Sequence, residues 1–524
     1  NTKQSLKKFE IAMNMHHLEL GLDWDKPVPK NLIDKVVAYC KWDVKATKKC
    51  FYYLEDDWNA RRVLAALSGL TVNHSTNAHT MQIIFGDDKH PQDEFVYTDL
   101  SKLFPGYEFK DGVSTYMGVE VGEGGYAKGD PGIWLNAFLD DITSMHPHSA
   151  KALNIFGDKY TKRYFSLVDT RVHIKHGEEA EARAMFDGRI GEIADELGIS
   201  LKGMSKALKV PINAVYGLTS AKFDNRCRDP RNVDNIVAKR GALFMITLVN
   251  EIKNRGFDVA HIKTDSIKVP DATEALQEFI FDFARKYGYE FEHEATYERM
   301  CLVNDAVYIA KYADGAHEFE LSTGEKILTP WTATGTQFQI PYVFKTLFTD
   351  VPINFNDCCE IKSSRTGPLY LDMNEGLPDV TEYEKEWKKR QKKNPDDPEL
   401  KELEKLISKG HNYVFIGNVG QFTPVKDGAG GGILCVLRNG KYVAATGTTG
   451  YRWLESEIAR ENGGLDIVDI SYYRKLCDGA VDAINEMAKL ANPAEEYENN
   501  AFDIFTTADA NSTELHSISR NVPF

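Results

Sequence analysis

The chain has 524 residues and a mass of 59.1 kDa, enough for two to four domains, and 42% of its residues are hydrophobic. Its longest apolar stretch is far shorter than the roughly 20 residues that cross a bilayer, and no apolar leader is seen, so no membrane association and a cytoplasmic location are expected. The formal net charge of −15 argues against a general affinity for polyanions, because binding to DNA or RNA depends on cationic contacts to phosphate.

Cysteine and cationic residues are distributed very differently. The eight cysteines are scattered, without a CxxC pair or the His spacing of a zinc site, so they are predicted to be reduced core residues. Between Lys202 and Arg240, in contrast, nine Lys or Arg residues stand against three Asp residues. Local charge can outweigh the total charge, so this basic segment is where an acidic chain is expected to contact phosphate.

The first half of the chain carries helix signals around two strand signals. Helical segments are predicted over residues 1–60, 150–208 and 232–255. Gly256 is a suitable residue to end the last of these. Short apolar runs that stop at polar turns predict a strand over 133–139, ending at Asp140 and Asp141, and a hairpin over 260–270.

The second half is less regular. Residues 319–380 show strand signals without a clear period, and a charged helix pair or linker from Lys385 is broken at Pro395 and Pro398. A β-hairpin is predicted around Asn439 and Gly440, a dipeptide that favours tight hairpin turns. The final 30 residues are acidic and polar, and we expect them to be poorly ordered.

The stretch LDDITSMHPHS, residues 139–149, is the first of three with chemical meaning. A strand that ends in carboxylates and enters a bend places Asp141 at a sheet edge, with the backbone N–H groups of residues 143–146 turned outward. Carboxylates beside free N–H groups suit a magnesium triphosphate, because the acid holds the metal and the amides hold phosphate oxygens. The alternative is that Asp140 and Asp141 are ordinary turn formers.

The second stretch is KALKVPINAVYGLTS, residues 206–220. On a helix, Lys209, Asn213 and Tyr216 fall at i, i+4 and i+7 and share one face. That face offers a cation for phosphate, an amide and a ring able to pack on a base, and Gly217 leaves room for close approach. Because proline disrupts a helix interior, the helix is predicted to start near Pro211. The alternative is an amphipathic helix with a solvated lysine.

The third stretch is AHIKTDSIKVP, residues 260–270, which places Asp265 at the tip of an apolar hairpin. Strands on both sides of a tight turn hold a side chain rigidly, as a metal ligand requires. A carboxylate buried without a cation is costly, so Asp265 needs solvent or a metal ion. The alternative is a plain exposed turn, for which Thr-Asp-Ser is good chemistry.

Together and in this order, the three stretches resemble the polymerase motifs of family B (polymerase alpha-like) DNA polymerases. DITSMHPHS is similar to DxxSLYPS, KVPINAVYG to KxxxNSxYG, and HIKTDS to YGDTDS. Further segments, among them SAKFDNRCRDPRN, CLVNDAVYIAKY and TGTTGYRWLE, resemble the bacteriophage branch of that family. The spacing of Lys209 and Tyr216 also fits family A, but the His-Asp-Glu motif that family A requires is absent from the sequence.

The resemblance implies an α+β fold with the layout of a right-hand polymerase: an antiparallel-sheet palm, helical fingers and a mixed thumb and C-terminal region. A helical remnant of an RNase H-like exonuclease domain would precede it. The implied division is residues 1–60 exonuclease remnant, 61–130 connector packing on the palm, 131–160 palm, 161–215 fingers, 216–318 palm, 319–494 thumb and C-terminal region, and 495–524 acidic tail.

The implied activity is template-directed addition of deoxynucleotides from dNTPs to a primer 3′-hydroxyl in phage DNA replication, with two Mg²⁺ ions, or Mn²⁺ in their place. The implied partners are primer–template DNA and dNTPs, and no accessory replication protein is indicated. The catalytic and metal-binding residues would be Asp141, Asp265 and the carbonyl of Ile142. The dNTP would contact Ser144, His146, Lys209, Asn213, Tyr216 and Gly217. DNA would contact Lys222, Arg226, Arg228, Arg231, Lys239, Arg240, Lys263 and Lys311.

The sequence departs from the family motifs at three positions. Lys263 replaces the first Asp of YGDTDS, which implies that Asp265 alone carries the ligation and that Lys263 faces phosphate or pairs with an acid. His146 replaces the Tyr whose ring excludes a ribose 2′-hydroxyl, so sugar discrimination is open. Ala214 replaces the motif Ser, and the short interval before Lys209 implies compact fingers.

The segment YCKWD, Tyr39 to Asp43, matches the YxxxD third motif of the family's 3′–5′ exonuclease. The first two motifs would lie upstream and are absent, so either the chain is truncated inside this domain or the domain is degenerate. Proofreading is expected to be absent in both cases. The alternative for YxxxD is a helix pair without catalytic meaning.

Two other functions stay open from the sequence. One is an inactive nucleic-acid-binding relative, in which Lys263 marks decay of the metal site. The other is a 3′–5′ exonuclease fragment whose polymerase half only binds DNA. Intact Asp141, Asp265, Lys209 and Tyr216 favour the active polymerase, because decay would be expected to reach them too.

Overall fold

The computed structural model describes residues 4–22, 25–122, 124–493 and 500–520. The chain forms two compact units and passes between them several times. Unit 1 comprises Asn1–Leu54, Glu320–Ile327 and Gln339–Ala480; unit 2 comprises Glu55–Phe319, Leu328–Phe338 and Val481–Phe524. Both combine helices with antiparallel sheets, which confirms the mixed α+β class. Within the described ranges, no helix has the length and apolar character needed to span a bilayer.

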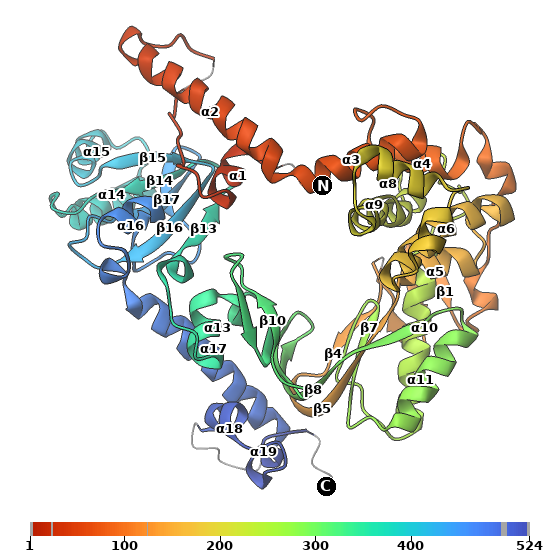
Figure 1. Cartoon of the computed structure of the whole chain (residues 1–524). Coiled ribbons are helices and arrows are strands. Elements are labelled where there is room, and N and C mark those ends of the chain that lie inside the picture. The colour runs from red at the N-terminus through yellow and green to blue at the C-terminus, as the bar shows by residue number, and fades with distance from the viewer. Residues whose placement is uncertain (1–3, 23–24, 123, 494–499, 521–524) are drawn as a thin grey trace. The chain divides into compact units, whose positions relative to one another are not determined.

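A seven-stranded antiparallel sheet is the centre of unit 2 (Figure 1). Its order is β12-β9-β8-β5-β7-β6-β4. The strands are β4 (Ala127–Gly129), β5 (Gly132–Ile142), β6 (His261–Lys263), β7 (Ser266–Pro270), β8 (Phe291–Asn304), β9 (Val307–Tyr312) and β12 (Trp331–Thr334). The strand predicted over 133–139 and the hairpin predicted over 260–270 are both confirmed, and β5 continues through Asp141.

The interior position of β5 follows from its sequence. Ile133, Trp134, Leu135 and Ala137 are at most 3% exposed, because β5 lies between β7 and β8 and its two faces are covered. Near-continuous apolar sequence of this kind is typical of a strand buried on both faces. Helices α10 (Ile236–Asn254) and α11 (Glu274–Lys286) pack beside the sheet (Figure 1). Helix α10 confirms the prediction over 232–255.

A group of helices forms the other part of the unit 2 core, and Figure 1 shows them gathered around α9. They are α3 (Glu55–Ser68), α4 (Thr76–Phe85), α5 (Met145–Ala152), α6 (Gly157–Lys175), α7 (Glu179–Ala184), α8 (Arg189–Leu197) and α9 (Leu201–Thr219). The helical prediction over 150–208 is therefore confirmed. The predicted start of a helix near Pro211 is wrong, since Pro211 lies inside α9. Ser200 caps the true start, and buried Met204, Leu208 and Ile212 hold the helix together despite the proline.

The C-terminal end of the chain is more ordered than its composition indicated. Residues 500–520 contain α18 (Ala501–Thr507) and α19 (Thr513–Ser517), with Phe505, Leu515 and Ile518 fully buried. The guanidinium of Arg299 donates to the carbonyl of Phe505 (2.9 Å). The expectation of poor order is thus wrong for this part, because a few apolar side chains anchor an otherwise polar segment. Residues 495–499 and 521–524 lie outside the described ranges.

Unit 1 has two small antiparallel sheets with helices around them. One sheet is β13 (Glu360–Ser363), β16 (Val419–Val425) and β19 (Arg452–Glu455); the other is β15 (Tyr413–Gly417), β14 (Leu369–Asp372), β17 (Ile433–Arg438) and β18 (Lys441–Ala444). Their core includes Trp453, which is fully buried. The turn between β17 and β18 has positive φ at Asn439 and Gly440, which confirms the predicted hairpin.

The helices of unit 1 match two further predictions. Helices α1 (Leu6–Ala12) and α2 (Ile33–Tyr53) confirm part of the helical prediction over 1–60, which is wrong for residues 13–22 and 25–29 because they form no helix. Helices α14 (Thr381–Lys393) and α15 (Leu400–Ser408) confirm the charged helix pair. The others are α13 (Pro341–Phe348), α16 (Ser456–Glu461) and α17 (Ile470–Ala491), the last passing into unit 2. The remaining elements of the chain are β1 (Glu108–Lys110), β2 (Val113–Tyr116), β3 (Val119–Glu120), β10 (His317–Glu320), β11 (Lys326–Thr329), α12 (Thr336–Gln339) and the 3₁₀ turns η1 (Lys30–Leu32), η2 (Pro91–Glu94), η3 (Leu100–Lys102), η4 (Phe355–Cys358) and η5 (Gly464–Ile467).

All eight cysteines are free thiols, as predicted. Five of them are buried: Cys227, Cys301, Cys358, Cys435 and Cys477. Cys40 is exposed on α2, so it is not a core residue, while Cys50 and Cys359 are half-buried.

Candidate active site

Two carboxylates from distant parts of the sequence meet at one edge of the unit 2 sheet. Asp141 lies near the end of β5, directly opposite Ser266 of β7. The backbone N–H of Ile142 donates to the carbonyl of Asp265 (2.9 Å), which is the residue that joins β6 to β7. Antiparallel pairing therefore places Asp141 and Asp265 side by side, as the order of the motifs led us to expect.

The turn that carries Asp265 is anchored on both sides. Thr264 has a positive φ of 60°, and its N–H donates to the carbonyl of Tyr126 (2.9 Å). The N–H of Asp265 donates back to the carbonyl of Lys263 (2.8 Å). A β-branched residue in the left-handed region is strained, so the neighbouring backbone must hold this turn in place. Such a fixed turn can present a carboxylate in one position.

The electrostatics of the pair favour a cation. Burial, together with the charges of Asp265 and Glu294, raises the pKa of Asp141 to about 7, although the charge of Lys268 opposes this shift. Burial likewise raises the pKa of Asp265. No ion pair joins either carboxylate to another residue in the described ranges. Two half-buried acids that repel each other gain most from a shared positive charge, which a metal ion would supply.

The same ranges contain no cluster of three or more His, Cys, Asp or Glu side chains arranged to hold a metal. A metal at Asp141 and Asp265 would therefore need other oxygen ligands. Ile142 follows Asp141 in the chain and its N–H bonds to the carbonyl of Asp265, so its own carbonyl is the candidate that the resemblance implies. Hard cations such as Mg²⁺ accept backbone, carboxylate and phosphate oxygens together. The donor set fits Mg²⁺ better than a softer metal.

A pH dependence of stability follows from the raised pKa of Asp141. Between its ordinary value of 3.8 and about 7, the folded protein keeps a proton that the unfolded chain has lost, so stability falls as pH rises through this window. We expect Asp141→Asn to remove up to about 2 kcal/mol of this dependence, after discounting for solvent screening. Urea unfolding in EDTA at pH 5 and pH 7.5 measures it. Equal pH dependence of wild type and variant would contradict the prediction.

The sequence reasoning missed a buried cation whose charge acts on Asp141. Lys268 of β7 is 3% exposed, and its ammonium lies 3.2 Å from Nδ1 of His261 and 4.9 Å from the ring centre of Tyr308. Nε2 of His261 lies 3.0 Å from the carbonyl of Asp305, so Nε2 carries the proton and Nδ1 accepts from Lys268. Burial and the positive charge of Lys263 lower the pKa of Lys268 to about 8, while the negative charge of Asp141 opposes this shift. A lysine inside an otherwise apolar strand was the signal available.

Asp140 faces away from Asp141 and has other partners. Its side chain is 1% exposed and accepts from Nε2 of Gln277 (2.9 Å), with Nδ1 of His293 at 2.8 Å. Burial raises the pKa of Asp140, and His293 and Gln277 oppose that shift. Only Asp141 of the acidic pair thus belongs to the site.

Ser144 and His146 follow Asp141 at the start of α5. Ser144 has left-handed backbone (φ 54°), which turns the chain sharply from β5 into the helix. The ring of His146 stacks on that of Tyr216 of α9, with centroids 4.3 Å apart and planes 8° apart. Nδ1 of His146 is buried without a partner, and burial lowers its pKa while Asp265 opposes. The stacking joins α5 and α9 beside Asp265.

The predicted face of α9 is present. Lys209, Asn213 and Gly217 are exposed and Tyr216 is half-buried, while the intervening Ile212 and Val215 are buried. A Cβ at Gly217 would meet no atom within 4 Å, so this position is open to a ligand. An amphipathic helix with a solvated lysine would show the same exposure, so the binding role of this face stays a prediction.

The basic segment after α9 divides into two groups. Tyr216, Lys222, Arg228 and Lys239 line a cleft of about 620 Å³ in unit 2. Arg228 pairs with Asp224 (2.6 Å). Lys239 is 4% exposed and donates to the carbonyls of Val121 and Gly122 (2.8 Å), so its contacts indicate a structural role. The cleft is the part of this segment that can hold a ligand.

The second group is engaged by the protein itself. Arg226 donates to the carbonyls of Gly86 (2.7 Å) and Asp88 (3.0 Å). Arg231 pairs with Asp229 (2.7 Å) and donates to the carbonyl of Phe95 (3.0 Å). Arg240 is 6% exposed, bonds to the carbonyl of Tyr287 and lies over the ring of Tyr289. These contacts indicate a structural role for the three arginines. The role is clearest for Arg240, whose burial keeps it away from DNA.

Lys263 and Lys311 have different surroundings on the sheet. Lys263 is exposed beside Asp265, and no ion pair to it occurs in the described part of the chain. Lys311 of β9 pairs with Glu298 (3.1 Å). Contacts of both residues with DNA stay predictions.

In unit 1, Tyr39 and Asp43 lie one turn apart on α2. The ammonium of Lys7 is 2.7 Å from Oδ1 of Asp43 and 4.6 Å from the ring centre of Tyr39. Lys7 also pairs with the buried Glu10 (3.1 Å). In the described residues, Asp43 is thus bound to a permanent cation.

Comparisons with known proteins add little to this geometry. No protein-family model matches the chain, and no curated protein matches it. One solved structure that the comparison matches to the chain is the family B DNA polymerase from the hyperthermophilic archaeon Pyrobaculum calidifontis, at a TM-score of 0.37 and 14% identity over 94% of this chain and 62% of that chain. The chain therefore spans less than two thirds of that polymerase. The residues of the site carry the functional assignment.

Proposed function

We propose that the chain is a DNA polymerase of the family B type, of the bacteriophage branch, which adds deoxynucleotides from dNTPs to a primer 3′-hydroxyl. The observation that carries the proposal is the pairing of β5 with the β6–β7 turn, which brings Asp141 and Asp265 together. Both carry a raised pKa and lack an ion pair in the described residues. These are the properties of carboxylates arranged for a shared divalent ion.

Asp141, Asp265 and the carbonyl of Ile142 would hold Mg²⁺. Bound there, the metal would supply charge stabilisation at the attacking and leaving oxygens of phosphoryl transfer. The protein's own part is positioning. The fixed turn at Thr264 orients Asp265, and N–H groups of the first turn of α5, after the sharp entry at Ser144, would meet phosphate oxygens near Asp141. The N–H of Thr143, which was predicted to face outward with them, donates instead to the carbonyl of Glu290 (2.9 Å).

The exposed face of α9 would bind the incoming nucleotide. Lys209 and Asn213 offer a cation and an amide for phosphate, and the stack of Tyr216 on His146 offers a rigid wall for the sugar and base. Lys222 and Arg228, which line the adjoining cleft, would contact the DNA backbone. The ring of His146 is smaller than tyrosine and has an unpartnered nitrogen, so sugar selection is expected to depend on it.

Proofreading is proposed to be absent from this chain. Asp43, the carboxylate that resembles an exonuclease metal ligand, is already neutralised by Lys7 (2.7 Å). A lone carboxylate bound to lysine is a poor metal ligand, because the metal would have to displace a permanent cation.

Primer extension tests the proposal. The chain is incubated with Mg²⁺, a labelled primer on a longer template, and all four dNTPs or none. Extension only with dNTPs and Mg²⁺ is the expected result. Binding without extension would favour the inactive nucleic-acid-binding relative, and shortening of the primer without dNTPs would favour the exonuclease.

A further inference from the structure

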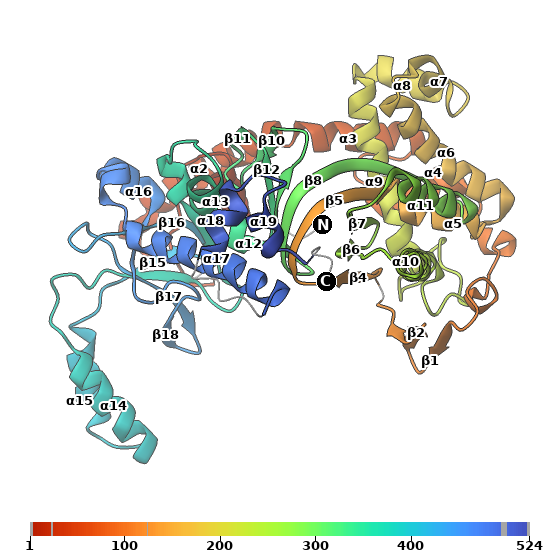
Figure 2. The same ribbon diagram turned by 90° about the horizontal axis from the view of Figure 1, so that it is seen from below.

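The α14–α15 hairpin is an arm of unit 1 inserted between β14 and β15. Figure 2 shows it projecting away from β15 and β17. The two helices pack on each other, and α14 has no buried residue. At the base, Nε2 of His411 lies 3.4 Å from Glu384, and its Nδ1 lies 2.6 Å from Asp372. The arm is thus attached to the sheet but adds little to the core of the unit.

From Lys385 to its C-terminal end, one side of α14 carries only lysines. Its members fall at i, i+3, i+4, i+7 and i+8, which is one face of a helix, and all are exposed. They are Lys385, Lys388, Lys389, Lys392 and Lys393, here named the lysine face. Lys385 pairs with Glu382 (2.7 Å), whereas the other four have no ion pair with any residue in the described ranges.

The opposite side of α14 contains the side chains that build the hairpin. Trp387 donates to Glu404 of α15 (3.2 Å), and Arg390 pairs with Glu386 (2.7 Å) and with Glu399 (2.6 Å). Folding of the arm therefore uses Trp387 and Arg390 and makes no use of the lysine face.

Helix stability does not explain the lysine face. Cations near a helix C-terminus are favourable, but this accounts only for the last turn and not for Lys385, Lys388 or Lys389. Like charges four residues apart destabilise a helix, and the face contains three such pairs: 385 with 389, 388 with 392, and 389 with 393. An external polyanion would relieve this repulsion.

We propose that the lysine face binds the phosphate backbone of double-stranded nucleic acid. Residues 385–393 extend about 12 Å along the helix axis, at about 1.5 Å per residue. Phosphates of one strand recur about every 3.4 Å along a duplex, so this length faces three to four of them. The four lysines without an ion pair in the described ranges match that number, and no apolar side chain that could anchor a protein partner lies among them. The identity of the duplex as primer–template rests on the proposed function.

Two variants with equal loss of charge test the proposal. Lys388→Gln/Lys389→Gln/Lys392→Gln removes three charges from the lysine face. Lys401→Gln/Lys405→Gln/Lys409→Gln removes three exposed lysines from α15 and its end, and is the matched control. The affinity of the full chain for a labelled primer–template duplex is titrated from 0.05 to 0.2 M KCl, without dNTPs. Thermal melting of both variants checks that they fold.

The first variant is expected to bind the duplex about tenfold or more weakly at 0.1 M KCl. The slope of log affinity against log salt should fall in magnitude by about 2 to 3, since each phosphate contact contributes about 0.9. The α15 variant should change the slope by less than about 1. Equal slopes in the two variants would overturn the proposal. This outcome is also the one expected if the lysine face binds an acidic protein and not a duplex. If the lysine-face variant changes the slope but the wild-type chain does not extend a primer, the duplex-binding proposal stands. The proposed polymerase activity is then rejected.

Discussion

Asp265→Asn is expected to lower primer extension by about 10³-fold or more while the protein stays folded. Charge stabilisation by a bound divalent ion is worth several kcal/mol of barrier, and each 1.36 kcal/mol corresponds to a factor of ten. Burial raises the pKa of Asp265, so the neutral amide removes an unfavourable charge from the folded state. The variant should therefore unfold at the same or a higher urea concentration. Single-turnover extension at saturating Mg²⁺ measures the loss.

Asp258→Asn is the matched control for this variant. Asp258 is an exposed carboxylate in the segment between α10 and β6, so the same change there should leave extension within about twofold. Extension by Asp265→Asn at more than about a tenth of the wild-type rate would remove Asp265 from the catalytic site. Loss of activity together with early unfolding would show a structural role instead.

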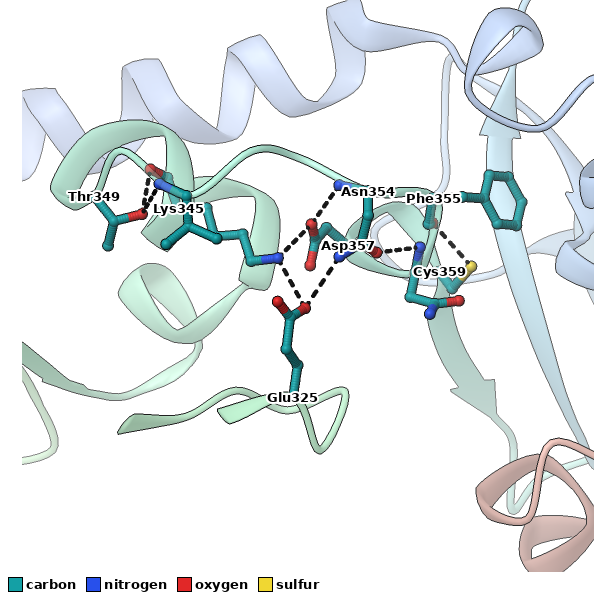
Figure 3. Close-up of polar contacts among 9 residues, drawn as sticks. Glu325, Lys345, Thr349, Asn354, Phe355, Asp357 and Cys359 are labelled. Atoms are coloured by element: carbon teal, nitrogen blue, oxygen red, sulfur yellow. Dashed lines mark hydrogen bonds and ion pairs between the residues drawn. The ribbon is translucent and has the colours of Figure 1, made fainter. Parts of the chain in front are cut away.

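A large loss of stability is expected when a buried ion cluster in unit 1 is broken (Figure 3). The ammonium of Lys345 is fully buried and contacts Glu325 (2.8 Å) and Asp357 (2.9 Å), and Asp357 is fully buried as well. Burial opposes the charge on Lys345, but the hydrogen bonds to Glu325 and Asp357 outweigh it and raise the pKa. Lys345→Met leaves Asp357 buried without its cation, and we expect a loss of about 3–5 kcal/mol in the free energy of unfolding.

Hydrogen exchange of the amides in α13 and η4 reports the stability of unit 1 apart from that of unit 2, so it measures this loss. Lys405→Met, in an exposed pair with Glu402 (2.8 Å), is the control and should change stability by less than about 1 kcal/mol. Lys345→Met/Asp357→Leu should recover part of the loss, because the uncompensated charge is removed. Equal protection in wild type and Lys345→Met would show that the cluster contributes little.

The sequence was most informative where spacing and chemistry agreed. The pattern of Lys209, Asn213 and Tyr216 predicted one face of a helix, and α9 presents that face. The placement of Asp265 in a hairpin turn and of Asp141 at the end of a strand was also correct. Both depend on local geometry, which short-range periodicity can indicate.

Other features depended on contacts that a single sequence does not display. The start of α9 was misplaced because tertiary packing of Met204 and Leu208 outweighed the local preference of Pro211. Arg240 looked like a DNA contact by charge alone, yet it is buried against Tyr289. The partner of Lys268 is His261, seven residues away across a hairpin, and its burial could be seen only once the sheet was formed.

The strand order of the unit 2 sheet also governs how the protein is made. Strand β5 is synthesised early, but its neighbours β7 and β8 lie beyond α9 and α10 in the chain. A nascent chain emerging from the ribosome must therefore expose an apolar central strand until residues up to Asn304 have followed. Such high contact order slows folding and lengthens the time during which aggregation competes. Shortening the helical insertion between the two halves of the sheet should speed its closure, since the loop to be closed becomes smaller.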